Sequence, residues 1–377
     1  MRIGIDGIPL APPRAGIGHY TFELARAIAS LIPKDTCELI APVPINLDTE
    51  DGIPAPANLH AVYVPVNAIR RRWWTIGLPL YVRRNKLTLF HGTNYNLPLW
   101  YGCPTVVTIH DLSLLLHSQT HREDLVRRAE KRLPTMTRIA TRIITDSESV
   151  KREICDHLKV SADKVTAIPL APRRNFHRAS EHECRAVRQR LGVEDDFILF
   201  VGTVEPRKNL ITLVRAFDEL LKQTELRPQL VIAGAKGWLT DELFADVDSG
   251  TRRERICFTG YVTDDDLRAL YSSCKVSVYP SLYEGFGLPT LEAMACGAPV
   301  ITSRIPVMIE TVGKSARLIE PTNVGQLTAA LAELLTDESA RQHFSASGFK
   351  RASVFSWERT ARGTLEVYQQ ALATAKV

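Results

Sequence analysis

The sequence has no stretch of about 18 or more uncharged apolar residues, so no segment is long enough to form a membrane-spanning helix. It also lacks the apolar region of a signal peptide, because Met1–Asp6 opens directly with a strand pattern. Its seven cysteines include no Cys-x-x-Cys pair, and such an odd, unpaired set is typical of reduced thiols. We therefore expect a cytoplasmic protein whose cysteines are mostly small apolar core residues.

A large excess of charge of one sign is also missing, because 47 Lys and Arg residues stand against 42 Asp and Glu residues, a net charge of +5. No recognised nucleic-acid-binding motif accompanies this mild excess, so nucleic acid is not an expected partner. The 377 residues exceed one ordinary hydrophobic core. We expect two domains, at 1–172 and 173–357, with a linker near 170–180.

The first half of the chain contains local clusters of basic residues. The densest cluster contains Arg70, Arg71 and Arg72, followed by Trp73 and Trp74. Cations interleaved with tryptophan suit the headgroup region of an anionic membrane. A solvated helical face is an equal alternative, since charge runs usually are one. The cluster therefore suggests, but does not require, peripheral contact with the inner face of the cytoplasmic membrane.

Short β-rich apolar runs alternate with helical patterns along the chain, which indicates parallel sheets covered by helices. The fold class is therefore α/β, and the expected strands are 2–8, 39–41, 62–65, 87–92, 105–109, 143–145, 165–168, 197–202, 229–234, 256–262, 276–279 and a final core strand at 299–302. Gly16 and Gly18 form an expected glycine-rich turn after the first strand, as in a Rossmann-like opening. The third glycine of the dinucleotide fingerprint is missing, so no nicotinamide site is expected.

The most informative stretch is 281–297, SLYEGFGLPTLEAMACG, which has the pattern of a glycine-rich loop and a short helix. The N–H groups after Gly285 and Gly287, together with the helix start, make an anion site. Glu284 and Glu292 lie eight residues apart and are better suited to sugar hydroxyls than to phosphate. This combination suggests a ligand that is both phosphorylated and rich in hydroxyls.

Two further groups stand at the ends of expected strands, where ligands collect in doubly wound sheets. Arg207 and Lys208 follow the strand at 197–202, and such a pair can clamp a diphosphate, the Arg fork binding two oxygens. Each charge-assisted hydrogen bond would contribute roughly 1.5–3 kcal/mol. His110 follows the strand at 105–109 and is expected to contact a donor hydroxyl, while Asp111 orients the turn or the acceptor. Ser147 is expected to cap a helix.

Two motifs carry a family resemblance, namely Glu-Gly-Phe-Gly-Leu-Pro with a second Glu eight residues on, and Gly-x-x-x-x-Arg-Lys-Asn. Together they resemble the signature of the retaining GT-B glycosyltransferases, in particular the large GT4 family (glycosyltransferase group 1). The resemblance covers most of the chain. It implies two Rossmann-like domains facing each other across a cleft, with a C-terminal helix at about 358–377 crossing back to the first domain. It also implies transfer of a hexose from a nucleoside diphosphate sugar with retention of anomeric configuration.

The resemblance further implies roles for matched positions. Glu284 would hold the transferred sugar and Glu292 the ribose, while Arg207, Lys208 and His110 would complete the catalytic set. The remaining positions implied in donor binding are Gly202, Gly260, Tyr261, Val262, Gly285, Phe286, Gly287 and Leu288. Gly16 and Gly18 match the cleft loop of the first domain. No Asp-x-Asp pair stands at a strand end, and the cations replace a metal, so no divalent metal or other cofactor is expected.

The donor and acceptor are suggested by finer similarities. The Gly-Ile-Gly-His-Tyr segment and the short His110-Asp111 pair look most like bacterial polysaccharide and O-antigen mannosyltransferases. GDP-mannose is therefore the first expectation for the donor, with UDP-sugars as the alternative, and the acceptor would be a saccharide or lipid-linked saccharide. A nucleotide-sugar epimerase or phosphorylase, and a catalytically silent binding subunit, are alternatives from other classes.

Overall fold

The structure is a computed structural model of the chain and describes residues 1–12, 16–47, 52–65, 72–100, 102–240, 247 and 251–374. Two compact units divide it: unit 1 is Met1–Leu112, Arg127–Ala171 and Ser356–Val377, and unit 2 is Ser113–Val126 and Pro172–Phe355. The division after Ala171 lies next to the expected boundary after residue 172. The segment Ser113–Val126, in contrast, groups with unit 2, although the sequence analysis placed it in the first domain.

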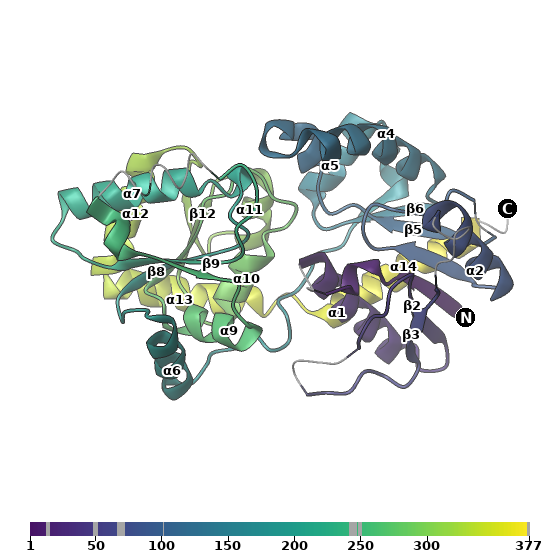
Figure 1. Cartoon of the computed structure of the whole chain (residues 1–377), viewed down its shortest axis with the longest axis horizontal. Helices are drawn as coiled ribbons and strands as arrows, with labels where there is room; N and C mark the ends of the chain where they lie inside the picture. Colours follow the sequence, from purple (N-terminus) through teal and green to yellow (C-terminus); the bar gives the residue numbers. More distant parts are fainter. Residues whose placement is uncertain are drawn as a thin grey trace. The chain divides into compact units, whose positions relative to one another are not determined.

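Unit 1 is built on a seven-stranded sheet with the order β3-β2-β1-β4-β5-β6-β7 (Figure 1). Neighbouring strands pair in parallel, for example Ile5 with Leu39 and Val107 with Ile143. The strands are β1 (Arg2–Asp6), β2 (Thr36–Ala41), β3 (Leu59–Tyr63), β4 (Leu89–Gly92), β5 (Thr105–Thr108), β6 (Arg142–Thr145) and β7 (Val165–Ala167). Each overlaps an expected apolar run, because a parallel strand covered by helices on both faces must be apolar almost throughout. The edge strand β3 differs, since it begins before the expected run at 62–65 and only Leu59 of its five residues is buried.

Helices cover both faces of this sheet: α1 (Gly16–Leu31) and α14 (Trp357–Thr374) lie on one face, and α4 (Glu123–Ile139) and α5 (Glu148–Leu158) on the other (Figure 1). The C-terminal α14 is fixed to unit 1 by polar as well as apolar contacts. Thr360 Oγ1 donates to the Pro169 carbonyl at 2.8 Å, and Tyr368 is buried beside His91. The smaller elements are η1 (Ile8–Leu10), the π-helix η2 (Trp73–Gly77), α2 (Leu78–Arg84) and η4 (Ala162–Lys164).

Unit 2 contains a six-stranded parallel sheet with the order β10-β9-β8-β11-β12-β13. The strands are β8 (Phe197–Val201), β9 (Gln229–Ala233), β10 (Ile256–Gly260), β11 (Val276–Tyr279), β12 (Val300–Ser303) and β13 (Arg317–Ile319). The expected final core strand at 299–302 is present as β12, but one more strand, β13, follows it at the sheet edge and was not predicted. This strand was missed because it is three residues long and begins with the exposed Arg317, so it forms no apolar run.

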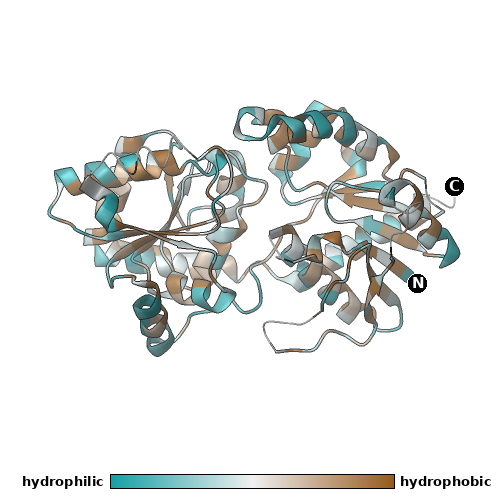
Figure 2. Ribbon diagram, viewed as in Figure 1, coloured by the Kyte–Doolittle hydropathy of each residue, from teal (hydrophilic) through white to brown (hydrophobic). Residues whose placement is uncertain are grey.

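Helices also cover both faces of the second sheet: α7 (Leu210–Gln223) packs with α12 (Val324–Thr336) on one face, and α9 (Asp264–Ser273), α10 (Leu288–Ala295) and α13 (Glu338–Ala352) lie on the other (Figure 1). The remaining elements are α3 (Ser113–Leu116), η3 (Ser118–Thr120), α6 (Glu181–Leu191), η5 (Pro206–Lys208), η6 (Thr251–Arg255) and α11 (Pro306–Val312). In each unit the apolar residues concentrate on the strands and on helix faces turned toward them (Figure 2). None of the helices in the described ranges is long and apolar enough to cross a membrane.

Candidate functional site

The candidate site of unit 2 begins where β8 ends. The chain passes Gly202, whose φ of +150° suits glycine, and reaches the short helix η5 and then Asn209. Asn209 adopts the left-handed conformation that asparagine tolerates, with φ of +59°, and its amide nitrogen donates to the carbonyls of Pro280 at 3.0 Å and Pro321 at 2.7 Å. One side chain thus ties the loop after β8 to the loops after β11 and β13.

Four charged side chains meet at this end of the sheet. Lys208 Nζ donates to Glu284 Oε1 and to Tyr279 Oη, both at 2.6 Å. Arg207 Nη2 donates to Glu205 Oε1 at 2.6 Å, and its Nη1 donates to the Tyr283 carbonyl at 2.9 Å and lies 3.3 Å from Glu284 Oε1. The structure therefore brings Arg207, Lys208 and Glu284 into one cluster, from segments that are 76 residues apart.

The cluster is buried, with Lys208 8% exposed and Glu284 7% exposed. Burial alone would raise the pKa of the Glu284 carboxyl, but Lys208 and Arg207 outweigh it and lower that pKa to about 2. Burial lowers the pKa of Lys208, and repulsion from Arg207 acts in the same direction, against the attraction of Glu284. The carboxylates of Glu205 and Glu284 therefore neutralise the two cations. An anionic ligand could bind Arg207 and Lys208 only by displacing these carboxylates.

The glycine-rich loop continues directly from Glu284. Gly287 is the N-cap of α10 and has a φ of +85°, and a Cβ on it would lie 2.5 Å from Met308 Sδ. Any other residue here would meet both backbone strain and a steric clash. The Phe286 carbonyl accepts a hydrogen bond from Thr311 Oγ1 at 2.7 Å. These contacts hold the loop in place, and α10 begins at Leu288, four residues after Glu284 of the charged cluster. Of the first three residues of α10, Pro289 has no N–H and the Thr290 N–H donates to the Gly287 carbonyl at 3.0 Å.

Glu292 lies on α10 and is 3% exposed, and its carboxylate is already paired. Arg173 Nε donates to Oε1 at 2.7 Å and Arg173 Nη2 donates to Oε2 at 3.0 Å, a bidentate arrangement. Arg173 also pairs with Asp264, and its guanidinium lies 4.2 Å from the centre of the Phe176 ring. Sequence reasoning missed Arg173, because the adjacent cations Arg173 and Arg174 in an expected linker give no sign of which acid either will meet.

The residues expected near a nucleobase follow β10. Gly260 ends this strand with a φ of +69°, and Tyr261 beyond it is 69% exposed. Val262 follows, before α9 begins at Asp264. Since the strands are parallel, this turn lies at the same carboxyl edge of the sheet as Gly202 and Glu284. Across the described ranges, no three His, Cys, Asp or Glu side chains gather where they would bind a metal ion.

Unit 1 has its own polar group at the carboxyl ends of β4, β5 and β6. His110 Nδ1 lies 2.8 Å from Asp146 Oδ2, and its Nε2 lies 2.9 Å from the Thr93 carbonyl oxygen. The Tyr20 ring packs edge-on against His110, with centroids 4.7 Å apart. Burial disfavours the charged imidazole, but Asp146 outweighs it and raises the pKa of His110. Because a carbonyl can only accept, Nε2 carries a proton.

This geometry changes the expectation for His110. Both ring nitrogens already have partners, so a sugar hydroxyl can reach one only if the bond to Asp146 or to Thr93 opens. The sequence analysis gave Asp146 no role and expected only that Ser147 caps a helix. The cap itself is confirmed, since Ser147 Oγ accepts from the Val150 N–H at 3.2 Å. The pairing of Asp146 with His110 joins two strand ends 36 residues apart and has no local sequence signal.

Two expectations for the first half of the chain need correction. Gly16 is the first residue of α1, so Gly16 and Gly18 form the first turn of a helix rather than a turn before it. In the basic cluster, Arg70 and Arg71 lie outside the described residues. Trp73 is buried inside unit 1 and cannot meet a membrane, whereas Arg72 is exposed. Trp74 is half-buried, and the Arg132 guanidinium lies over its ring, 5.8 Å from the ring centre.

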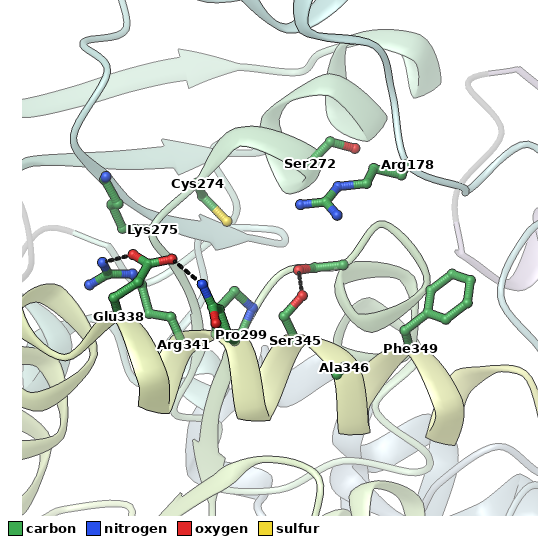
Figure 3. A pocket seen from close by; sticks show the side chains of 12 residues that line it. Arg178, Ser272, Cys274, Lys275, Pro299, Glu338, Arg341, Ser345, Ala346 and Phe349 are labelled. Atoms are coloured by element: carbon green, nitrogen blue, oxygen red, sulfur yellow. Dashed lines mark hydrogen bonds and ion pairs between the residues drawn. The ribbon is translucent and has the colours of Figure 1, made fainter.

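A groove of about 740 Å³ lies elsewhere on unit 2 (Figure 3). Lys275 and Pro299 line it and directly precede β11 and β12, so it opens at the amino end of the sheet, opposite the charged cluster. Glu338 bonds to Arg341 and to Gln342 within the groove (Figure 3). Its lining includes none of the residues expected to bind a donor.

Comparison with known proteins places this site in a family. The model of the glycosyl transferases group 1 matches residues 186–351, and that of Glycosyltransferase Family 4 matches residues 14–171. An O-antigen chain mannosyltransferase B from Escherichia coli is 33% identical over 389 residues, covering 98% of this chain and 100% of the relative. The serotype-specific mannosyltransferase WbdA from the same organism is 32% identical over 72% of this chain and 34% of its own length.

Solved structures with the same fold are more distant in sequence. Sucrose-phosphate synthase from Thermosynechococcus elongatus has a TM-score of 0.76 at 21% identity, covering 99% of this chain and 100% of that one. Anabaena HepE in complex with UDP-glucose has a TM-score of 0.74 at 18% identity, covering 100% and 99%. These two neighbours bear on the fold alone. With both halves matched by family models and a relative aligned over its full length, the chain belongs to the family 4 (group 1) glycosyltransferases and has the GT-B fold.

Proposed function

We propose that the protein transfers a hexose, mannose from GDP-mannose, to a saccharide or lipid-linked saccharide acceptor, with retention of anomeric configuration and without a divalent metal. The observation that carries this proposal is the buried cluster of Arg207, Lys208 and Glu284 beside the Gly287–Leu288 helix start. Such a cluster offers two cations and the backbone at the start of α10 to a diphosphate, and a carboxylate to a sugar hydroxyl.

The proposed reaction uses the cations as electrostatic stabilisers. The bond between C1 of the sugar and the diphosphate oxygen breaks, and Arg207, Lys208 and the start of α10 stabilise the negative charge that develops on the diphosphate. The acceptor oxygen attacks C1 on the same face, and its proton passes to the departing phosphate oxygen. Lys208 turns from Glu284 to the diphosphate, so that the Glu284 carboxylate accepts a hydroxyl of the transferred sugar. Charge on the leaving group is thus neutralised by side chains, and the proposal assigns no role to a metal.

Other residues would bind the parts of the donor that do not react. Glu292 accepts from the ribose hydroxyls with the oxygen lone pairs that Arg173 does not use. The backbone of Gly260, Tyr261 and Val262 frames the nucleobase, and Gly202 allows the diphosphate to approach the end of β8. His110 would contact a hydroxyl of the donor after one of its two hydrogen bonds opens.

The choice of mannose rests on the relatives. The aligned Escherichia coli proteins are named mannosyltransferases, and one of them acts on O-antigen chains, which supports GDP-mannose as donor and a polysaccharide as acceptor. UDP-sugars stay the alternative donor class. A nucleotide-sugar epimerase and a silent binding subunit remain alternatives from other classes.

A donor panel tests the proposal. Thermal shift with GDP, UDP and their sugars should show the largest stabilisation with GDP and GDP-mannose, since ligands that bind the native state stabilise it. Transfer assayed with GDP-mannose and a mannose-terminated acceptor should continue in the presence of EDTA and give product with the donor's anomeric configuration. Conversion of the donor to a sugar isomer without acceptor would favour the epimerase. Binding without any turnover would favour the silent subunit.

We further propose peripheral contact between unit 1 and an anionic membrane surface. Arg72 and Trp100 are exposed, and Trp100 Nε1 donates to the Thr75 carbonyl at 2.6 Å, next to Trp74 and Arg132. Cosedimentation with vesicles containing anionic lipid should be strong at low salt and should weaken as salt screens the charges. Equal binding to neutral and anionic vesicles would contradict the proposal.

A further inference from the structure

The segment Ser113–Val126 lies outside the motifs of the family, yet it contacts unit 2 at two places. The first contact is between rings: His117 lies over Tyr283, with centroids 4.8 Å apart and an interplanar angle of 37°. The second is a hydrogen bond from Trp238 Nε1 to the Thr120 carbonyl at 2.8 Å. These contacts explain why the segment groups with unit 2 rather than with the first domain.

The His117 contact acts on Tyr283, whose backbone is hydrogen-bonded to the charged cluster. The Tyr283 carbonyl accepts from Arg207 Nη1 at 2.9 Å, and Glu284 is the next residue in the chain. The backbone of Arg207 is bound to the same loop, because the Leu282 N–H donates to the Arg207 carbonyl at 2.9 Å. A ring that holds Tyr283 in place therefore holds both the loop that carries Glu284 and the direction of the Arg207 guanidinium.

The Trp238 contact acts on the neighbouring loop. Trp238 follows a turn that pairs with the residues before Glu205, since the Val204 N–H donates to the Ala235 carbonyl and the Gly237 N–H to the Val204 carbonyl, both at 3.0 Å. The segment Ser113–Val126 thus contacts the loop that carries Glu284 directly, and it contacts the loop that carries Arg207 only through the 235–238 turn, which pairs with Val204. It is itself held together, because Thr120 Oγ1 and the Thr120 N–H both donate to the His117 carbonyl.

We propose that His117 is a positioning residue for the donor site: by packing on Tyr283 it holds the 282–284 loop in the conformation that aims Arg207 and Glu284 at the donor diphosphate and sugar. This inference rests on the proposed donor site. The role proposed for His117 is this ring packing, so we expect a flat ring of similar size to fulfil it. Its packing acts on binding of the nucleotide more than on the chemical step.

The test compares His117→Ala with His117→Phe, and uses His343→Ala as the matched control. His343 is an exposed histidine of the same unit that also packs against an aromatic ring, Phe344, but it lies on α13, away from the charged cluster. The dissociation constants of GDP and UDP, measured by titration calorimetry, should rise about 2- to 12-fold in His117→Ala, the range expected for one lost aromatic pair. His117→Phe and His343→Ala should bind as the wild type does.

Two additional measurements separate this role from a general loss of stability. The double variant His117→Ala with Tyr283→Ala should bind no more weakly than the weaker single variant, because both changes remove one contact. Hydrogen exchange at the Leu282 amide should accelerate in His117→Ala and not in His117→Phe, with no ligand present.

The outcomes distinguish this inference from the proposed function. A wild-type protein that binds neither GDP nor UDP would refute the proposed function, while the exchange experiment would still test the loop. Normal exchange and normal nucleotide binding in His117→Ala would refute the inference alone. Exchange in His117→Phe as fast as in His117→Ala would also refute it, because the ring itself would then not be what holds the loop.

Discussion

Replacement of Lys208 by Met is the most direct test of the charged cluster. Methionine keeps most of the length and apolar surface of the lysine stem but removes the charge and three donors. In the structure this deletes the two 2.6 Å hydrogen bonds from Nζ to Glu284 Oε1 and Tyr279 Oη. Glu284 then remains buried with Arg207 Nη1, 3.3 Å away, as its nearest remaining cation.

The expected loss has a catalytic and a structural part. Removing one donor to charge that develops in the transition state lowers kcat by about 10²–10³, and we expect a loss of this size in sugar transfer. Breaking a buried ion pair from one side costs about 3–5 kcal/mol of unfolding free energy. We expect about 3 kcal/mol, the low end, because Arg207 still offsets part of the Glu284 charge. Transfer kinetics and urea denaturation measure the two parts separately.

A second substitution separates them within one protein. Adding Glu284→Gln to Lys208→Met removes the orphaned charge, so stability should recover while transfer stays low, because neither group is then available to the donor. Lys222→Met is the matched control: Lys222 pairs with Asp218 at 2.6 Å but is 61% exposed, so its loss should cost under about 1 kcal/mol and leave transfer unchanged. Transfer by Lys208→Met within about threefold of wild type, an effect far below that of one lost donor, would refute the proposed role of the cluster.

Three other predictions concern groups that are buried and paired. Tyr368→Phe removes the partner 2.7 Å from Nδ1 of the fully buried His91, and should lower the unfolding free energy by about 1–3 kcal/mol in urea denaturation. Arg173→Ala leaves Glu292 buried without its bidentate partner, and should cost about 3–5 kcal/mol, with less lost in Arg173→Ala combined with Glu292→Gln. The pKa of Glu284 in the folded protein, about 2, lies below its unfolded value, so ionised Glu284 stabilises the fold. This stabilisation is complete above about pH 5 and is lost as the pH falls toward 2. In Glu284→Gln, the drop in unfolding free energy between these pH values should therefore be smaller by about 3 kcal/mol, as urea denaturation at each pH would show.

Local patterns were sufficient to predict most of the fold. A strand such as β5 or β8 is an apolar, β-rich run because helices cover both of its faces, and this requirement shows directly in the sequence. The glycines of the loop before α10 are equally visible, because Gly287 needs a positive φ and has no space for a Cβ beside Met308. β13 was missed because a three-residue edge strand buries too few side chains to require an apolar run.

Pairings between distant segments could not be predicted in this way. The contacts of Arg173 with Glu292 and of His110 with Asp146 join residues 119 and 36 positions apart, and nothing near either residue specifies the partner. The sequence indicated that His110 stands at a strand end. It could not indicate that both ring nitrogens are engaged there, because that depends on where β4 and β6 end.

The ion pairs also bear on how a donor would bind. A buried lysine or glutamate alone would cost several kcal/mol of desolvation. The pairing of Lys208 with Glu284 offsets this cost for both charges in the protein without ligand. A diphosphate that takes over Lys208 must replace the carboxylate's attraction, so part of its binding energy goes into opening that pair. Glu284 is then left needing new donors, and the hydroxyls of a sugar supply them. On this reasoning a nucleoside diphosphate sugar should bind more tightly than the same nucleoside diphosphate, and Glu284→Gln should narrow that difference, as titration calorimetry with both ligands would show.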